Sequence, residues 1–415
     1  MKFNFLIYYI ALFAMVFTSC KKRTVADEIK PAGAENTPSE ESITKPVAFS
    51  KLEKADSFYF VQSAMIKEGA KYDPSIAAFT TLSKYDVVVY RIQYKTTFQE
   101  RVISASGIVC IPVSREKSWP VLSYHHGTVF ANSDAPTNNK NDQFVIASLS
   151  SAGYIVSTPD YIGFGASFGI THPYYVAEYA ASASRDLLLA TQEYLDQKKI
   201  STNGKLFLAG YSQGGNVTMA VSKSIDLQPI PGFELIASAA GAGGYNMEGI
   251  FTDITSRTTY PSPNYVAYII ESYRKTYQFD KTESYYFREP YASRIPSLIN
   301  GLTGSSEINN QLTTVFDSLI QPGFVDGVRT GTDSQFKNAL KCNSLHNWKP
   351  TRLLRIYHSD ADEVVPFSDS EETYNHMLGL GSTTVSFVPI QGKNHGQGSV
   401  PMIAAVIEWF NTLNQ

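Results

Sequence analysis

The chain has 415 residues, of which 43% are hydrophobic and 18% charged, so it can bury one large core with an insertion or two modest domains. Its formal net charge is −3 and its one basic cluster is Lys21-Lys22-Arg23, which argues against a nucleic-acid-binding protein. No two histidines have the spacing of metal ligands, such as H-x-x-x-H, so we expect neither a metal nor another cofactor.

The first 20 residues have the pattern of a signal peptide. Lys2 precedes an apolar stretch, 3–17, that is too short to span a bilayer comfortably and ends at Thr18-Ser19-Cys20. The segment resembles a bacterial lipoprotein signal, although Phe17 stands where leucine is usual. The resemblance implies acylation of Cys20 after cleavage, and hence a lipid anchor in the bacterial cell envelope, periplasmic or at the outer membrane. Simple secretion and an uncleaved anchor are the alternatives.

The rest of the chain divides into a tether, a core and an insertion. Residues 21–48 are polar, contain scattered Pro and Ser, and lack periodicity, which predicts a disordered tether. We assign residues 49–244 and 350–415 to the core. The intervening 245–349 is far longer than one crossover requires, and we interpret it as a cap.

Apolar runs and helical patterns alternate along the core. We expect a helix near Phe58 to Glu68, then two antiparallel strands, Asp86–Tyr94 and Ile103–Ile111. A helix is expected at Ser182–Asp196, where leucines recur at helical spacing. Further strands are expected at Pro120–Tyr124, Tyr154–Thr158, Lys205–Ala209, Leu235–Ala240, Arg352–Tyr357 and Thr384–Pro389. This alternation predicts a mainly parallel sheet with helices on both faces and ligands at the carboxyl ends of its strands.

Two cysteines fall inside this core and insertion. Cys110 lies in a strand-like run and is interpreted as a small buried residue. Whether it pairs with Cys342 in an oxidising compartment is left open.

A G-x-S-x-G motif marks the candidate nucleophile. Gly210-Tyr211-Ser212-Gln213-Gly214 follows an apolar run and precedes a helical stretch, so a strand turns sharply into a helix at Ser212. Glycines are required because a Cβ would clash at so tight a turn. The motif alone arises by chance, but with a strand before it and a helix after it we predict a nucleophile elbow in an α/β-hydrolase fold.

The loop His125-His126-Gly127-Thr128 follows an earlier strand of the same sheet. In this fold such a loop supplies one oxyanion donor, so the backbone N–H groups of Thr128 and Gln213 are the expected oxyanion hole. The two histidines are expected to shape the loop rather than to act as a base.

A serine nucleophile requires a histidine base and a carboxylate, in the chain order Ser, acid, His. Asp360 and Asp362 both follow the strand at Arg352–Tyr357, and we choose Asp362 because the stretch resembles the D-x-V-V-P turn of many α/β-hydrolases. His395, in a turn after the last strand, is the expected base.

Tyrosines are concentrated in the cap. Tyr265, Ile269, Tyr273 and Tyr277 recur every fourth residue and therefore share one helix face. This stripe either packs the cap onto the core or lines the pocket roof, and Tyr265, Tyr268 and Tyr273 are the candidates for substrate contact. Short, medium or aromatic acyl esters would suit such a roof better than triglycerides.

Four motifs together resemble the secretory lipase family and its bacterial lipoprotein esterase relatives. They are Tyr124-His125-His126-Gly127-Thr128, Pro159-Asp160-Tyr161-Ile162-Gly163-Phe164-Gly165, His172-Pro173-Tyr174 and Gly210-Tyr211-Ser212-Gln213-Gly214-Gly215. The resemblance implies a serine esterase or lipase acting on small-molecule or lipid esters. We interpret Asp160 and Tyr161 as loop structure, with a pocket role for Tyr161 as the alternative. A peptidase of the same fold and a non-catalytic, surface-anchored binding lipoprotein are the competing functions.

Overall fold

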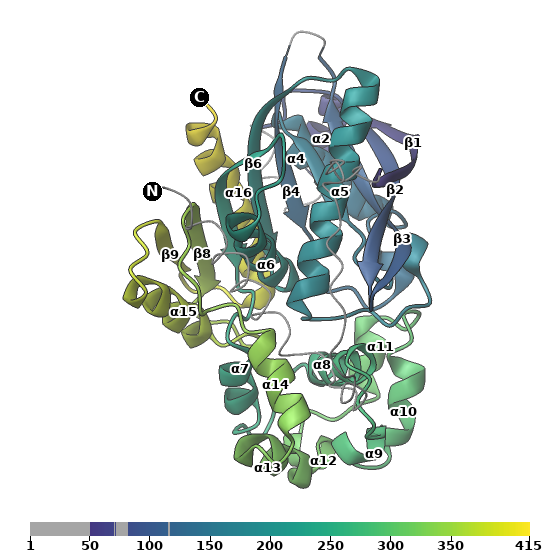
Figure 1. Ribbon diagram of the computed structural model, residues 1–415, viewed down its shortest axis with the longest axis vertical. Helices are drawn as coiled ribbons and strands as arrows, with labels where there is room; N and C mark the ends of the chain where they lie inside the picture. The colour runs from purple at the N-terminus through teal and green to yellow at the C-terminus, as the bar shows by residue number, and fades with distance from the viewer. Residues whose placement is uncertain (1–49, 70, 72–81, 115–116) are drawn as a thin grey trace, which may run out of the picture. The chain divides into compact units, whose positions relative to one another are not determined.

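The computed structural model describes residues 50–69, 71, 82–114 and 117–415 (Figure 1). The signal peptide, including Cys20, and the whole tether expected from the sequence lie outside these residues. None of the helices in the described residues has the length and hydropathy of a membrane-spanning segment.

A nine-stranded sheet forms the centre of the described chain, in the order β1-β2-β3-β5-β4-β6-β7-β8-β9. Strands β1, β2, β3 and β5 pair antiparallel in that order, and every pair from β5 to β9 is parallel. The strands are β1 Leu52–Val61, β2 Val87–Phe98, β3 Arg101–Pro112, β4 Trp119–His125, β5 Ile155–Pro159, β6 Thr202–Tyr211, β7 Glu234–Gly241, β8 Leu353–Ser359 and β9 Val385–Ile390. The mainly parallel sheet predicted from the alternation of elements is confirmed.

Alternating side chains of the central strands belong to separate apolar layers. In β6, Leu206 and Leu208 pack into one core cluster and Phe207 and Ala209 into another. A strand buried on both faces requires such a continuous apolar run. The same run is what made this strand recognisable in the sequence.

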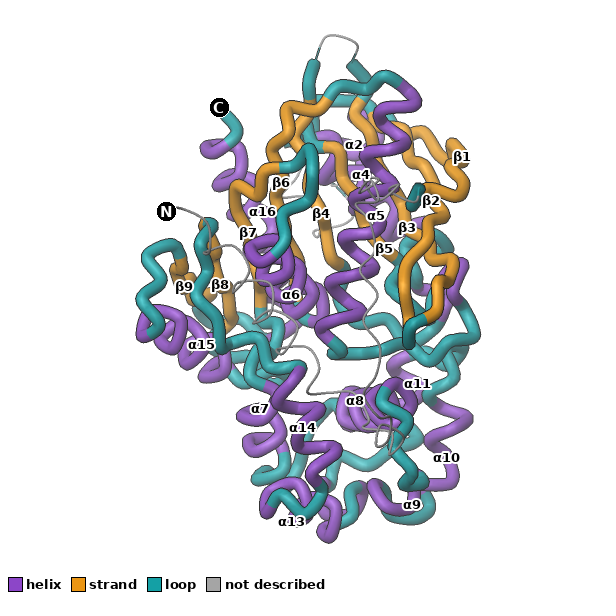
Figure 2. The backbone as a smooth tube through the Cα atoms, viewed as in Figure 1, coloured by secondary structure: helices purple, strands orange, loops and turns teal. Residues whose placement is uncertain are grey.

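Helices cover both faces of the sheet (Figure 2). One layer contains α5 Ala177–Lys198, α6 Gln213–Leu227 and α15 Phe367–Gly379, whose side chains join the cluster around Leu206. The other contains α2 Ser63–Gly69, α4 Lys140–Ser151 and α16 His395–Leu413, which join the cluster around Phe207. Two short 3-10 turns, η2 Asn132–Asp134 and η3 Gly165–Ser167, lie in the loops that follow β4 and β5.

The helix expected near Phe58 to Glu68 is wrong in its first part. Phe58 to Val61 belong to strand β1, and only Ser63–Gly69 is helical. Residues of β1 pair with β2, for example Phe60 with Val88, so the backbone hydrogen bonds come from a distant segment. The aromatic and β-branched residues of this stretch suit a strand, but an exposed edge strand gives no clear alternation of buried and polar residues.

The insertion between β7 and β8 folds into helices that gather at one end of the sheet (Figures 1 and 2). They are α7 Met247–Ile254, α8 Pro263–Thr276, α9 Glu283–Tyr286, α10 Tyr291–Leu298, α11 Ser305–Asn310, α12 Phe316–Leu319, α13 Pro322–Thr330 and α14 Ser334–Cys342. Their apolar side chains form a third cluster, which includes Tyr268, Tyr273 and Phe336.

Cys110 is buried in β3 and its thiol is free. It therefore does not pair with Cys342.

Candidate active site

Ser212 lies at a sharp turn between β6 and α6. Its backbone has φ 58° and ψ −128°, a conformation that a non-glycine residue rarely adopts. A Cβ on Gly214 would overlap the carbonyl oxygen of His125, and one on Gly210 would overlap the carbonyl oxygen of Gly214. The glycines of the motif are therefore required by the close approach of this turn to β4.

The structure brings Ser212, His395 and Asp362 together, although they are far apart in the sequence. Ser212 Oγ lies 2.9 Å from His395 Nε2, and His395 Nδ1 lies 2.6 Å from Asp362 Oδ2. Since a carboxylate only accepts hydrogen bonds, Nδ1 carries a proton and, in the neutral ring, Nε2 is free to accept one from the serine. Such an arrangement is suited to general-base activation of a hydroxyl.

His395 is held in place by its backbone. It is the first residue of α16, whose N-cap is Asn394 in a capping box with Gln397. The N–H of His395 donates to Glu363 Oε2 at 3.1 Å, and its carbonyl oxygen accepts from the Tyr211 hydroxyl at 2.7 Å. Both the backbone N–H and the backbone carbonyl of His395 are therefore held by hydrogen bonds. We did not predict Glu363, although it is adjacent to Asp362 in the sequence.

Asp362 has no exposed side-chain surface and accepts several hydrogen bonds. Its Oδ1 accepts the N–H groups of Val364 and Val365 at 2.9 and 2.8 Å. Burial acts to raise the pKa of Asp362, but hydrogen bonds from His358 and His395 outweigh it and hold the pKa below its ordinary value. The carboxyl is therefore charged at neutral pH.

Asp360, the alternative acid, has a different environment. Its Oδ1 accepts the N–H of Gly392 at 2.7 Å, which joins the end of β8 to the turn after β9. Of the two carboxylates, Asp362 is the one that contacts His395.

The loop after β4 lies beside Ser212. A Cβ built on Gly127 would be 3.9 Å from the Cβ of Ser212. The next residue, Thr128, makes a hydrogen bond of 2.8 Å through Oγ1 to the Tyr174 hydroxyl. Gln213 is the first residue of α6, so its N–H has no acceptor one turn earlier in the helix. Of the two expected oxyanion donors, Gln213 thus directly follows Ser212, and Thr128 belongs to the loop that lies beside Ser212.

The histidines around this loop are buried and have structural partners. His125 contacts Ser123 and Thr218 at 3.0 and 2.8 Å. The side chain of His172 lies 2.7 Å from Nε2 of Gln213. Burial lowers the pKa of His125 and of His172 to about 3 and that of His126 to about 4, so all three are neutral near pH 7.

Tyr161 and Asp160 have structural partners in neighbouring loops. The Tyr161 hydroxyl donates to the carbonyl oxygen of His126 at 2.9 Å, and its backbone has φ 68°. Asp160 accepts from Ser106 at 2.6 Å and twice from Thr137, at 2.6 and 2.8 Å. The described residues that line the cavity at Ser212 do not include Tyr161.

The cavity at Ser212, called here the Ser212 cavity, has about 450 Å³ of empty volume, part of it open to solvent. The core contributes Ser212, Tyr174, Tyr175, Val364 and Val365. The cap contributes Met247, Ile250, Ile254, Tyr260, Tyr265, Val266 and Ile269. Ser212 and four tyrosines are its polar residues, and aliphatic side chains form the rest of the wall.

Of the three cap tyrosines expected to contact substrate, one lines the Ser212 cavity. Tyr265 lines it, Tyr268 stacks on Tyr174 with ring centroids 4.4 Å apart, and Tyr273 is fully buried. Tyr174, Tyr175 and Tyr260 also line the cavity, and they were not among the residues predicted to contact substrate. Tyr174 is part of the His172-Pro173-Tyr174 motif, which was the available signal for it.

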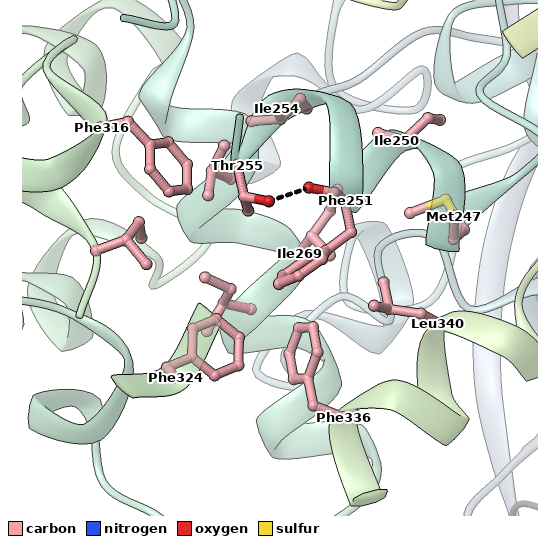
Figure 3. Close-up of a pocket in the computed structure, with 13 residues that line it drawn as sticks. Met247, Ile250, Phe251, Ile254, Thr255, Ile269, Phe316, Phe324, Phe336 and Leu340 are labelled. Atoms are coloured by element: carbon pink, nitrogen blue, oxygen red, sulfur yellow. Dashed lines mark hydrogen bonds between the residues drawn. The ribbon is translucent and has the colours of Figure 1, made fainter. Parts of the chain in front are cut away.

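A second cavity, called here the cap cavity, lies among the cap helices and has about 440 Å³ of empty volume (Figure 3). It shares with the Ser212 cavity the residues Met247, Ile250, Ile254, Val266 and Ile269. Its own residues include Phe316, Phe324 and Phe336. Among the described residues in its wall, Thr255 has the one polar side chain, and its hydroxyl donates to the carbonyl oxygen of Phe251 at 2.7 Å. The cavity therefore offers an apolar surface, because the Thr255 hydroxyl is already hydrogen-bonded.

In the part of the chain that the structure describes, no group of three or more His, Cys, Asp and Glu side chains is arranged to hold a metal ion.

Comparisons with known proteins agree on the kind of fold. The family model described as secretory lipase matches residues 132–413. A putative hydrolase from Legionella pneumophila is 27% identical with a TM-score of 0.82, covering 88% of this chain and 98% of its own. The rice cell wall degrading esterase LipA from Xanthomonas oryzae is 25% identical with a TM-score of 0.76, covering 87% and 97%.

A third solved structure, Candida antarctica lipase A in its closed state, is 15% identical with a TM-score of 0.64, covering 88% of this chain and 83% of its own. At that identity it is evidence for the fold alone. No curated protein matches the sequence. The α/β-hydrolase fold predicted from the sequence is confirmed by these structures.

Proposed function

Since the chain belongs to the secretory lipase family and is a hydrolase of the lipase and esterase type, we propose that it cleaves carboxylic esters with Ser212 as nucleophile. His395 is the general base and Asp362 its carboxylate partner. The observation that carries this proposal is the unbroken hydrogen-bond chain of 2.9 Å from Ser212 to His395 and 2.6 Å from His395 to Asp362.

The reaction follows from the positions of these atoms. His395 Nε2 accepts the proton of Ser212 as Oγ attacks the ester carbonyl carbon, and Asp362 stabilises the imidazolium that forms. His395 then returns the proton to the leaving alcohol, which breaks the ester bond and leaves an acyl-enzyme on Ser212. Water, activated by the same histidine, releases the carboxylic acid.

The negative charge on the carbonyl oxygen requires donors. The N–H groups of Gln213 and Thr128 are proposed for this role, because Gln213 directly follows the nucleophile and Gly127 lies beside it. Tyr174 supports Thr128 through the 2.8 Å contact between their hydroxyls.

The two cavities suggest where the acyl chain binds. We propose that the acyl chain of the substrate starts at Ser212 and that its methylenes extend past Ile250 and Ile269 toward the cap cavity. Each buried methylene contributes about 0.8 kcal/mol. Esters with medium-length acyl chains are therefore favoured over acetyl esters, and an aromatic acyl group suits the tyrosines around Ser212.

A peptidase of the same fold remains the alternative activity. Peptidases of this fold commonly hold a peptide terminus with a charged group, whereas the side chains that line the Ser212 cavity carry no formal charge among the described residues. The Xanthomonas relative is described as an esterase, which also favours esters. A binding lipoprotein without activity would have no use for the paired serine, histidine and carboxylate.

The proposal is tested with the purified protein and p-nitrophenyl esters of increasing chain length, alongside aminoacyl p-nitroanilides. Ester hydrolysis is expected, and Ser212→Ala should lower kcat by about 10⁴-fold or more because the covalent route is lost. Ser318→Ala, at an exposed serine of α12, is the matched control. Cleavage of the anilides alone would favour the peptidase, and retained activity in Ser212→Ala would exclude the proposed nucleophile.

For localisation we propose export and a lipid anchor at Cys20, with plain secretion as the alternative. The family is described as secretory, which agrees with export. In cells fed labelled palmitate, the full-length chain should take up label and Cys20→Ala should not. Label that persists in Cys20→Ala would exclude this anchor.

A further inference from the structure

Asp362 contacts two histidines. Besides His395, His358 at the end of β8 points Nε2 at Asp362 Oδ2, 3.2 Å away. The same Nε2 lies 3.1 Å from the carbonyl oxygen of Val365, and the His358 side chain has no exposed surface. The reaction proposed above does not require this second histidine.

The partners of His358 determine where its proton lies. Both atoms that face Nε2, a carboxylate oxygen and a carbonyl oxygen, only accept hydrogen bonds, so Nε2 carries a hydrogen. On the other side, Nδ1 lies 2.6 Å from Ser370 Oγ on α15, and that hydroxyl can donate to it. A neutral imidazole therefore shares the one hydrogen on Nε2 between Asp362 Oδ2 and the carbonyl oxygen of Val365, and accepts at Nδ1 from Ser370.

We propose that His358 is a positioning residue for the catalytic acid, and that its Nε2–H holds Oδ2 of Asp362 in its charged form and aimed at His395. This role rests on the proposed function of Asp362. Together with His395 and the N–H groups of Val364 and Val365, His358 is the fourth donor to the carboxylate.

A buried carboxylate depends on such donors. Burial disfavours the charged form, and each donor to a charged group offsets part of that cost. Without His358, Oδ2 retains one partner, and the carboxyl accepts a proton at a higher pH than before. Catalysis requires the charged form, so activity should be lost earlier on the acid side of the pH profile.

The other titratable groups near this pair come from several elements. Asp369 on α15 interacts with His358 through its charge, and Glu363 accepts the N–H of His395. Four phenols whose pKa values lie above the ordinary one also interact with Asp362, namely Tyr175, Tyr211, Tyr260 and Tyr265. These phenols are neutral below pH 9, so they do not titrate in the acid range that the test uses.

The test compares three variants with the wild-type protein, using p-nitrophenyl butyrate read at a wavelength where nitrophenol and nitrophenolate absorb equally. His358→Phe removes the donor, His358→Gln retains an N–H donor, and His376→Gln changes an exposed histidine on α15 as the control. His358→Phe should lower kcat roughly 10-fold to 100-fold with little change in KM, because a hydrogen bond to a charged group is lost.

In the same variant the acid limb of kcat/KM should move to higher pH. His358→Gln should restore most of kcat and return the limb toward its wild-type position, and His376→Gln should match the wild-type protein. An unmoved acid limb in His358→Phe overturns the proposal, since a residue that only packs would lower stability without changing the pH profile. Equal defects in His358→Phe and His358→Gln overturn it as well.

If His358→Phe does not fold, Ser370→Ala carries the test because it leaves His358 in place. Without the hydroxyl at Nδ1, the tautomer with hydrogen on Nε2 is less favoured, so the acid limb should move in the same direction by a smaller amount. If the acid limb of Ser370→Ala stays in place and Ser212→Ala still abolishes activity, the role of His358 is overturned and the proposed function is not. Activity that survives Ser212→Ala overturns the proposed function and this role together.

Discussion

The core and the cap contribute different atoms to the Ser212 cavity. The core supplies Ser212, His395 and Asp362. His395 lies within hydrogen-bonding distance of Ser212, and Asp362 within hydrogen-bonding distance of His395. The cap supplies mostly aliphatic side chains, such as Ile250 and Ile269, that continue into a second, apolar cavity. Under the proposed function, the core would carry the chemistry and the cap would select the substrate.

The two regions are nevertheless joined at the loops that carry the site. Cap hydroxyls donate to core carbonyl oxygens, from Tyr260 to Val364 at 3.0 Å and from Tyr273 to Tyr175 at 3.2 Å. Val364 also donates its N–H to Asp362. A change in the cap can therefore reach the acid loop, and the division between chemistry and selection has to be tested on both sides.

After the change at Ser212 described above, the largest effect is expected from the core acid. Asp362→Asn should lower kcat by about 10⁴-fold with the fold intact, because an amide at this position favours the wrong tautomer of His395. Asp360→Asn, the matched control two residues away, should remain within a few-fold, since its oxygen can still accept from Gly392. Steady-state kinetics on a butyrate ester compares the two. Equal losses would mean that Asp360 has a part in the chemistry.

The next effect is expected from the wall shared by the two cavities. Ile269→Trp should narrow the way to the cap cavity and exclude two to four methylenes, which lowers kcat/KM for an octanoyl ester roughly 10-fold to 200-fold. The rate with an acetyl ester should stay nearly constant. Leu302→Trp, at an exposed residue of the cap, is the control. Proportional losses on both esters would contradict a role for the cap in selection.

A smaller effect separates two tyrosines of the cap stripe. Tyr265→Ala should change the preference among ester chain lengths several-fold, since Tyr265 lines the Ser212 cavity. Tyr273→Ala should leave the preference unchanged but reduce the free energy of unfolding by about 3–5 kcal/mol, as expected for a large buried side chain. Relative kcat/KM and urea denaturation measure the two outcomes. A chain-length shift in Tyr273→Ala would reverse this assignment.

The smallest effect concerns the junction of core and cap. Asp369 on α15 accepts the N–H groups of Tyr245 and Asn246, where the cap begins, at 2.7 and 2.8 Å. Burial raises its pKa to about 6. Between about pH 4 and pH 6 the folded state therefore binds more protons at this group than the unfolded state does, and the stability from Asp369 falls as the pH rises.

Asp369→Asn should remove that part of the pH dependence. The free energy of unfolding of the variant, followed by urea denaturation from pH 4 to pH 7, should fall less with rising pH than that of the wild-type protein. Asp317→Asn, at an exposed aspartate of the cap, is the control and should keep the wild-type slope. A slope in Asp369→Asn equal to the wild-type slope would contradict a raised pKa for Asp369.

Local patterns in the sequence were sufficient for part of this protein. The glycines around Ser212 and the apolar run before it predicted the strand, the turn and the helix, because the G-x-S-x-G motif between a strand and a helix is a local pattern. The repeated apolar runs predicted the parallel sheet, because strands buried on both faces are apolar along their whole length. Asp362 and His395 follow strands of that sheet, and strand ends on one edge bring such residues close together.

Contacts between distant segments decided the rest. Residues 58–61 became an edge strand because β2 supplies their hydrogen-bond partners, and no pattern within those residues records this. The second partner of Asp362 depends on how His358, Val365 and Ser370 meet in space. The cap cavity depends on which faces of separate helices leave a gap between them. Sequence by itself determines which segments are apolar and which turns are sterically allowed, whereas cavities and shared hydrogen bonds are decided by tertiary packing.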